Sequence, residues 1–243
     1  MGWIIRCLLA LIVLAAGPVS PTRAAEQVDL LLVLASDVSR SVDHPKFLLQ
    51  RKGYAAAITD PRVLAAITSG PYQRIAVCFV EWAGWTSQNV VIDWTLIGDG
   101  AAARMFGDQL LEVPRAFADR TSISGGLSFA LKQLEQAPYE ADRRAIDVSG
   151  DGTNNSGPEV TSARDEVLSK GVTINGLVIL TPVPGPWLSE HTNPTGGIEK
   201  YYRDNVIGGP GAFVVVAEDH NSFGQAIVKK LIAEIALLPR PVE

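Results

Sequence analysis

Three short polar segments carry oxygen-bearing side chains that could hold a hard cation. The first is Asp37-Val38-Ser39-Arg40-Ser41, the second surrounds Thr121, and the third contains Asp151. Carboxylate and hydroxyl oxygens are the ligands that Mg²⁺, Mn²⁺ and Ca²⁺ prefer, whereas zinc and copper sites favour His and Cys. The spacing of Asp37, Ser39 and Ser41 lets one turn direct three side chains to a single point. The first segment alone is a weak signal, but the three together predict a site for one divalent cation, with Mg²⁺ expected and Mn²⁺ or Ca²⁺ as alternatives.

The segments that would position these side chains alternate between strand-like and helix-like patterns. Strands are predicted at residues 28–36, 74–82, 89–97, 144–149, 172–180 and 213–218. Helices are predicted at residues 45–58, 63–67, 101–111, 124–136, 158–170, 198–206 and 222–237. The short connection at residues 84–88 predicts a hairpin, which would make 89–97 an antiparallel edge strand. The alternation predicts an α/β fold with three layers, in which helices cover both faces of a doubly wound, mostly parallel six-stranded sheet.

The polar segments fall where such a sheet binds ligands. Ligands lie beyond the carboxyl ends of the strands, where the strand order reverses. Asp37 directly follows the first predicted strand, and Asp151 follows the strand at residues 144–149. Asp147, inside that strand, is expected to accept a hydrogen bond behind the ion. A simpler interpretation also stands, in which Asp37 and Ser39 only cap the following turn and helix.

The first 24 residues have the composition of a secretory signal peptide. A short segment with one basic residue precedes the unbroken apolar run 7–16, and Thr22-Arg23-Ala24 offers a cleavage site. The run is too short for a membrane-spanning helix, which needs about 20 residues. A retained N-terminal anchor is the alternative. We therefore expect export to the periplasm or cell exterior, a mature chain with no stable membrane span, and one domain over residues 25–243.

The composition of the mature chain excludes some partners. Removing residues 1–24 leaves 19 basic and 26 acidic side chains, a net charge of −7, with no basic cluster. Nucleic acid is therefore not expected as a partner. Cys78 is the one cysteine left and lies in an apolar run, so it predicts a small buried side chain and no internal disulfide.

Asp37-x-Ser39-x-Ser41, together with Thr121 and Asp151, resembles the metal-ion-dependent adhesion site of von Willebrand factor type A domains. The order of predicted elements from about residue 28 to 237 resembles that fold as well. A narrower resemblance is to a bacterial family of exported type-A-like proteins of uncharacterised function. It rests on residues 80–82, 143–152, 171–177, 201–204 and 208–214.

This resemblance implies a role for each residue of the site. Ser39, Ser41 and Thr121 would ligate the ion, and Asp37 and Asp151 would act directly or through water. An acidic group of a protein partner would then complete the coordination. Arg40 departs from the pattern, because a Gly is common at its place. Its charge would either discourage the cation or attract the acidic partner.

The function implied is a metal-dependent, adhesion-type protein-binding module and not an enzyme. Two alternatives remain: a metal-dependent hydrolase on a related sheet, and a structural domain whose metal site has lapsed. The sequence has no Gly-x-Ser-x-Gly elbow, and His44, His191 and His220 form no recognisable triad pattern. The Pro-rich segment 181–187 leaves the end of a predicted strand, and its Trp187 is expected to frame the partner site together with Arg40.

Overall fold

The computed structural model describes residues 25–180, 189–219 and 221–236. The expected signal peptide at 1–24 and Trp187, which is expected to frame the partner site, lie outside these ranges. Among the described residues, no helix has the length and apolar character needed to cross a bilayer.

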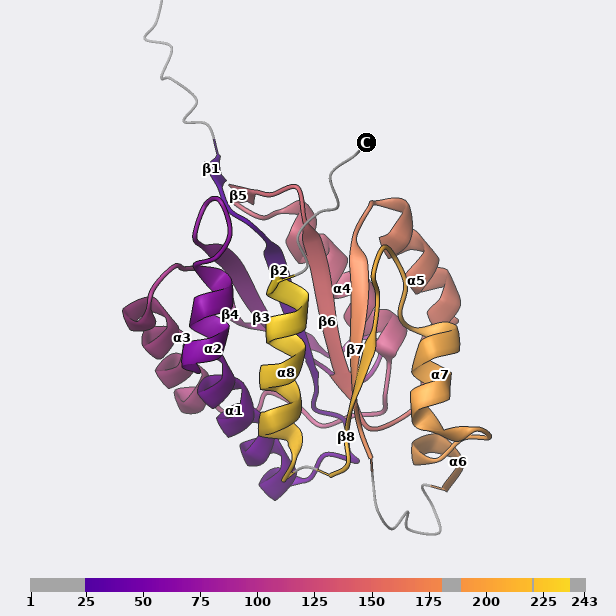
Figure 1. Ribbon diagram of the computed structural model, residues 1–243. Coiled ribbons are helices and arrows are strands. Elements are labelled where there is room, and N and C mark those ends of the chain that lie inside the picture. The colour runs from indigo at the N-terminus through magenta and orange to yellow at the C-terminus, as the bar shows by residue number, and fades with distance from the viewer. Residues whose placement is uncertain (1–24, 181–188, 220, 237–243) are drawn as a thin grey trace, which may run out of the picture.

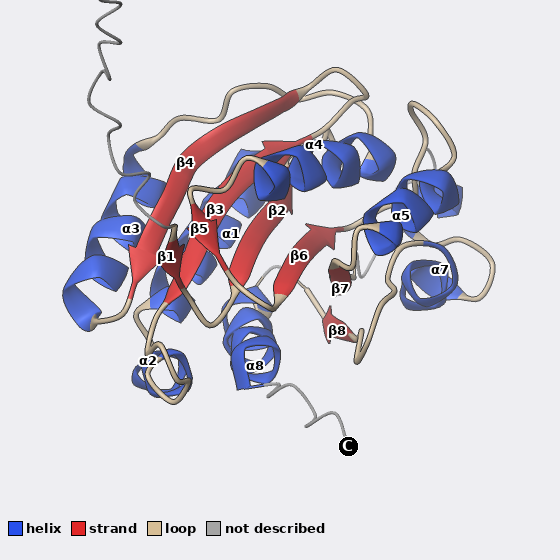
Figure 2. Cartoon of the chain, turned by 90° about the horizontal axis from the view of Figure 1, so that it is seen from above, coloured by secondary structure: helices blue, strands red, loops and turns tan. Residues whose placement is uncertain are grey.

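Six strands form the central sheet in the order β4-β3-β2-β6-β7-β8 (Figures 1 and 2). They are β2 (Leu31–Asp37), β3 (Ile75–Trp82), β4 (Gln88–Ile97), β6 (Arg144–Gly150), β7 (Thr173–Ile179) and β8 (Val214–Ala217). Only β4 is antiparallel to its neighbour, and its pairing with β3 is interrupted by an irregularity near Phe79. The predicted six-stranded sheet with one antiparallel edge strand is confirmed.

Helices cover both faces of the sheet, as predicted (Figure 2). On one face lie α1 (His44–Ile58), α2 (Pro61–Ile67), α3 (Gly100–Glu112) and α8 (Phe223–Ala236). On the other lie α4 (Ile123–Glu135), α5 (Val160–Ser169) and α7 (Gly197–Asn205). Three short elements were not predicted: β1 (Glu26–Gln27), β5 (Tyr139–Glu140), which pairs with β1, and α6 (Ser189–Thr192).

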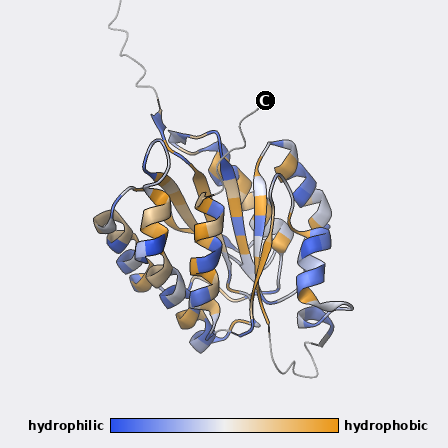
Figure 3. Ribbon diagram, viewed as in Figure 1, coloured by the Kyte–Doolittle hydropathy of each residue, from blue (hydrophilic) through white to orange (hydrophobic). Residues whose placement is uncertain are grey.

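The central strands are buried on both faces, which explains their continuous apolar sequences. In β2, Leu32 and Leu34 pack into the core beneath α1, α2, α3 and α8, whereas Leu31, Val33 and Ala35 pack beneath α4, α5 and α7. Figure 3 shows apolar residues along the strands and on the inner helix faces. Two cores therefore fix the sheet from both sides.

The order in which the chain adds strands to the sheet reverses between β2 and β6. From β2 the strand order runs through β3 to the edge at β4, and the second half starts at β6, on the other side of β2. β2 and β6 are parallel, so Asp37 at the end of β2 and the turn after Gly150 of β6 lie at the same edge. This is the switch point where such sheets bind ligands.

Candidate metal centre

Four of the five predicted ligand residues are joined by hydrogen bonds at this switch point. The fully buried Asp37 accepts a bond at Oδ1 from the backbone N–H of Ser39, at 2.7 Å. The hydroxyls of Ser39 and Ser41 lie 3.1 Å apart, and the Ser41 hydroxyl donates to Asp151 Oδ1 at 2.5 Å. The turn after β2 therefore curls as the spacing predicts, and it meets the turn after β6.

Two carboxylate oxygens of this cluster have no partner. Oδ2 of Asp37 and Oδ2 of Asp151 are both buried, with no hydrogen bond from any described residue. Burial, followed by the neighbouring charge of Asp151, raises the pKa of Asp37 to about 8. Two buried carboxylates with unpaired oxygens are unfavourable unless a cation or a proton offsets them. The donor set of carboxylates and hydroxyls fits a hard divalent cation.

The floor of the cluster requires a glycine. A Cβ at Gly150 would lie 2.5 Å from the hydroxyl oxygen of Tyr202 and 3.1 Å from Asp37 Oδ2. Tyr202 comes from α7 and is fully buried, and its hydroxyl finds no partner among the described residues. Burial, and then the charges of Asp37 and Asp151, raise the pKa of this phenol well above its usual value. Tyr202 therefore presents a neutral hydroxyl below the carboxylates.

Thr121, the fifth predicted ligand, lies beside the turn after β6. Its backbone N–H donates to Asn155 Oδ1 at 2.9 Å, and its carbonyl accepts from the backbone N–H of Asn155 at 2.9 Å. Its hydroxyl is 3.1 Å from Nε2 of His191. The other ring nitrogen of His191 is 3.1 Å from the hydroxyl of Thr153. His191 thus covers the turn that carries Asp151, a role that the sequence did not indicate.

These histidine contacts do not make a nucleophilic triad. A triad needs an acid that orients the imidazole, yet among the described residues the partners of both ring nitrogens of His191 are hydroxyls and an amide. Burial lowers the pKa of His191, against the attraction of Asp151. His44 is exposed at the start of α1, where its ring stacks on Phe47. His220 lies outside the described residues.

Arg115 holds the turn after β2 from outside, and no sequence signal pointed to it. Its guanidinium donates to the backbone carbonyls of Val42 at 2.7 Å and of Ser39 at 2.9 Å, and to that of Val38. Burial lowers the pKa of Arg115, while nearby acids, including Asp37, act in the opposite direction. The guanidinium of Arg115 therefore fixes three backbone carbonyls of the turn.

The rim of the cluster combines positive charge with an aromatic ring. Arg40 is exposed, and its backbone N–H donates to the carbonyl of Asp119 at 2.9 Å. Arg40 and Arg120 both act on the carboxylate of Asp119, whose pKa is lowered chiefly by the backbone N–H of Arg120. Trp85, in the β3–β4 turn, is 43% exposed and lies against Gly157 and Gly125 near the start of α4. Trp82, by contrast, is fully buried.

Within the described residues, no three His, Cys, Asp or Glu side chains converge as a metal-binding group. Any ion here would therefore depend on serine and threonine hydroxyls beside the two carboxylates. Asp147 does not lie behind this site as expected: it faces α8 and pairs with Lys230, 2.8 Å away.

A sequence profile of the family described as "Protein of unknown function (DUF1194)" matches residues 27–239, and the chain belongs to this family. No curated protein matches it. Among solved structures, an aerotolerance-related membrane protein from Bacteroides fragilis has 18% identity and a TM-score of 0.52, covering 83% of this chain and 98% of its own.

Two further solved structures share the fold. Proximal thread matrix protein 1 from the mussel byssus, with a zinc-occupied MIDAS motif, has 16% identity and a TM-score of 0.58. A von Willebrand factor type A protein from Catenulispora acidiphila has 14% identity and a TM-score of 0.59. Each match covers 86% of this chain but only 46% and 43% of the other chain, respectively. The fold is that of von Willebrand factor type A domains.

Proposed function

We propose that this chain, as a DUF1194 family member with a type A fold, is an exported metal-ion-dependent protein-binding module and not an enzyme. The observation that carries the proposal is the pair of buried carboxylates, Asp37 and Asp151, each with one unpaired oxygen at the sheet's switch point. Adhesion-type relatives of this fold, including a pilus adhesin, support a binding role. In this proposal the signal at residues 1–24 is removed, and residues 25–243 act as one domain.

The ion would be held by the residues of the two turns. Ser39, Ser41 and Thr121 would supply hydroxyl oxygens, and Asp37 and Asp151 would supply negative charge directly or through water. Mg²⁺ fits this oxygen donor set best, and Mn²⁺ and Ca²⁺ are the alternatives. When bound, the ion would supply a positive centre that offsets the two carboxylates and attracts an anionic group.

The partner is expected to present an Asp or Glu side chain. Arg40 and Arg120 place positive charge at the rim, where they would steer an acidic surface to the site. Trp85 offers an exposed ring that lies against Gly125 and Gly157, and tryptophans are enriched among the residues that anchor protein interfaces. Trp187 is proposed to frame the partner site as well.

The test is capture from the exported proteins of the source cell on immobilised mature protein. We expect one or more proteins to be retained in Mg²⁺, released by a chelator, and absent from an Asp151→Ala column. Trp85→Ala is expected to weaken retention, while Trp94→Ala serves as the matched control, because Trp94 bonds the α4 carbonyl of Gln133 away from the site. Retention that is the same with chelator and with Asp151→Ala would contradict the proposal.

Metal-dependent turnover of a model phosphate or ester, lost in Asp151→Ala, would favour the hydrolase alternative.

A further inference from the structure

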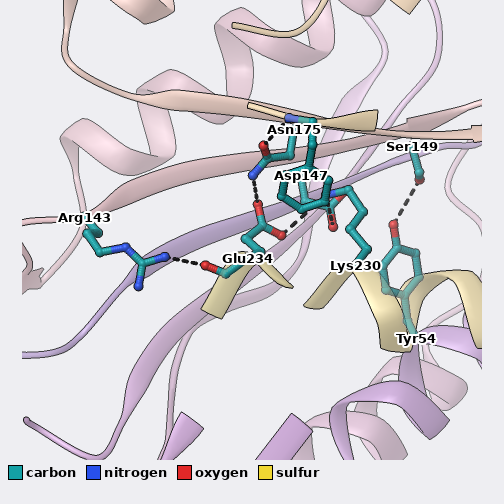
Figure 4. A network of polar contacts seen from close by, with 8 residues as sticks. Tyr54, Arg143, Asp147, Ser149, Asn175, Lys230 and Glu234 are labelled. Atoms are coloured by element: carbon teal, nitrogen blue, oxygen red, sulfur yellow. Dashed lines mark hydrogen bonds and ion pairs between the residues drawn. The ribbon is translucent and has the colours of Figure 1, made fainter. Parts of the chain in front are cut away.

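A second buried polar cluster lies between β6, β7 and α8 (Figure 4). Lys230 of α8 and Asp147 of β6 are both fully buried, and the lysine Nζ is 2.8 Å from Asp147 Oδ2. Glu234, one turn further along α8, has Oε2 3.4 Å from the same Nζ. Apart from Lys230, neither carboxylate oxygen of Asp147 has a partner among the described residues. The cluster takes no part in the proposed metal site.

The surroundings of the cluster fix its geometry. Asn175 of β7, the register partner of Asp147, donates from Nδ2 to Glu234 Oε1 at 2.6 Å. The backbone N–H of Phe213 donates to Asn175 Oδ1 at 3.2 Å, and the Phe213 ring centroid lies 5.5 Å from Lys230 Nζ. Glu234 is therefore oriented by an amide, and an aromatic ring lies over the amine.

Burial favours the protonated form of Asp147. Burial is the largest influence on Asp147, and although Lys230 opposes it and Glu234 adds to it, the pKa of Asp147 rises to about 7. Two other groups face the cluster. Arg143 donates to the backbone carbonyls of Glu234 and Ile235, and Tyr54 donates to Ser149 at 3.0 Å. Near neutral pH, Asp147 can therefore carry a proton, and transferring the lysine proton to it leaves an amine facing a carboxylic acid.

We propose that Lys230 and Asp147 form an intramolecular amide cross-link, with Glu234 as the proton-transfer group. The proposal rests on the contact between amine and carboxyl, the complete burial of both, and a second carboxyl in reach of the amine. It is independent of the proposed metal-dependent function.

The reaction balances without any cofactor. The lone pair of neutral Lys230 Nζ attacks Cγ of protonated Asp147, and an N–C bond forms. Glu234 accepts a proton from the attacking nitrogen and passes it to the hydroxyl that leaves Cγ. One amide and one water molecule result, and nothing is oxidised or reduced. Holding the amine, the acid and the proton acceptor in one buried cluster supplies the proximity that such a step needs.

The cross-link would join the C-terminal helix α8 to β6 at the centre of the sheet. The described residues contain one cysteine, the buried Cys78, and no disulfide. An amide is a covalent cross-link that forms without an oxidising compartment and resists reduction.

Mass spectrometry of the full-length protein decides the proposal. The protein is denatured and digested with trypsin, and the peptide at residues 145–164, which contains Asp147, is followed. We expect this peptide to be joined to residues 230–243 with the loss of one water, because a modified Lys230 no longer supports cleavage. Recovery of residues 145–164 as a free peptide, with cleavage after Lys230, would overturn the proposal.

Variants separate the cross-link from other losses of water. Lys230→Met is expected to abolish the joined peptide, and Glu234→Gln to prevent or greatly slow its formation. Lys229→Met is the matched control, because Lys229 is exposed next to Lys230. Residues 145–164 should still be joined to Lys230 in this variant, now within residues 204–243, because trypsin no longer cleaves after residue 229. Asp151-Gly152 lies in the same peptide and can also lose water by cyclising. Residues 145–164 recovered from the wild type as a free peptide that has lost one water would therefore reflect this cyclisation and count against the cross-link.

Discussion

Removing one partner of the buried ion pair Arg51–Glu81 is expected to destabilise the whole fold. Arg51 of α1 and Glu81 of β3 are 3% and 1% exposed, and Nη2 of Arg51 lies 2.7 Å from Glu81 Oε1. Glu81 is the register partner of Ser36, one residue before Asp37, so the pair supports the strand ends that carry the metal turn. A misplaced strand end would disturb the site as well.

The magnitude follows from the burial. Unit charges about 4 Å apart interact by about 4 kcal/mol at an effective dielectric constant near 20. Breaking a buried pair by removing one partner costs about 3–5 kcal/mol. We expect Arg51→Met to lower the free energy of unfolding by that amount at pH 7. In Arg51→Met/Glu81→Met no charge is left unpaired. The double variant should lose only about 1–3 kcal/mol, because the carbonyl of Leu110 loses its bond from Arg51.

The assay is urea denaturation of the metal-stripped protein, monitored by circular dichroism. The dependence of the free energy of unfolding on urea concentration should be the same in the wild type and the variants. Burial already raises the pKa of Glu81, and the variant removes the arginine that opposes this rise. A group whose pKa is raised in the folded state contributes stability at low pH, and this contribution is lost as the pH rises. The loss of free energy of unfolding in Arg51→Met should therefore become smaller on acidification. A double variant as unstable as the sum of the two single variants would refute the reasoning.

Three further predictions concern the metal site. Gly150→Ala is expected to cost about 1–3 kcal/mol in denaturation, because its Cβ meets Tyr202 and Asp37, whereas Gly224→Ala, with only an ordinary contact at 3.8 Å, should be within about 1 kcal/mol of wild type. Arg115→Met should weaken metal binding about tenfold or more in calorimetry, while Arg120→Met, at an exposed residue, should leave it unchanged. Asp37→Asn should raise the melting temperature of the chelator-treated protein, because it removes one of two buried carboxylates, and should abolish stabilisation by added metal. Unchanged stabilisation by metal in that variant would contradict its role.

Most of the fold could be predicted from local patterns. Continuous apolar runs indicated the strands buried on both faces, and the short 84–88 connection indicated the antiparallel edge strand. β1, β5 and α6 were missed because elements of two to four residues have no periodicity to detect. The shared edge of Asp37 and Asp151 also followed from sequence, because parallel strands bring their carboxyl ends together.

The supports of the site could not be predicted, because they depend on tertiary contacts. Arg115 and His191 reach the turns from segments with no motif of their own. Asp147 was misplaced for the same reason: alternation along β6 fixes a face of the sheet, but only packing shows that α8 presents Lys230 there. Tyr202 lies in residues 201–204, one of the segments that resemble the bacterial family. Its position under Gly150 could not be predicted from the sequence.

The central claim is that the carboxylates at the switch point bind one divalent cation. Its most direct test is calorimetric titration of the mature, metal-stripped protein with Mg²⁺, Mn²⁺ and Ca²⁺, repeated with Asp151→Ala. The account predicts saturable binding of one ion per chain by the wild type and none by the variant, with both proteins folded by circular dichroism. Absence of binding by the folded wild type, or equal binding by Asp151→Ala, would contradict it and favour a structural domain with a lapsed site.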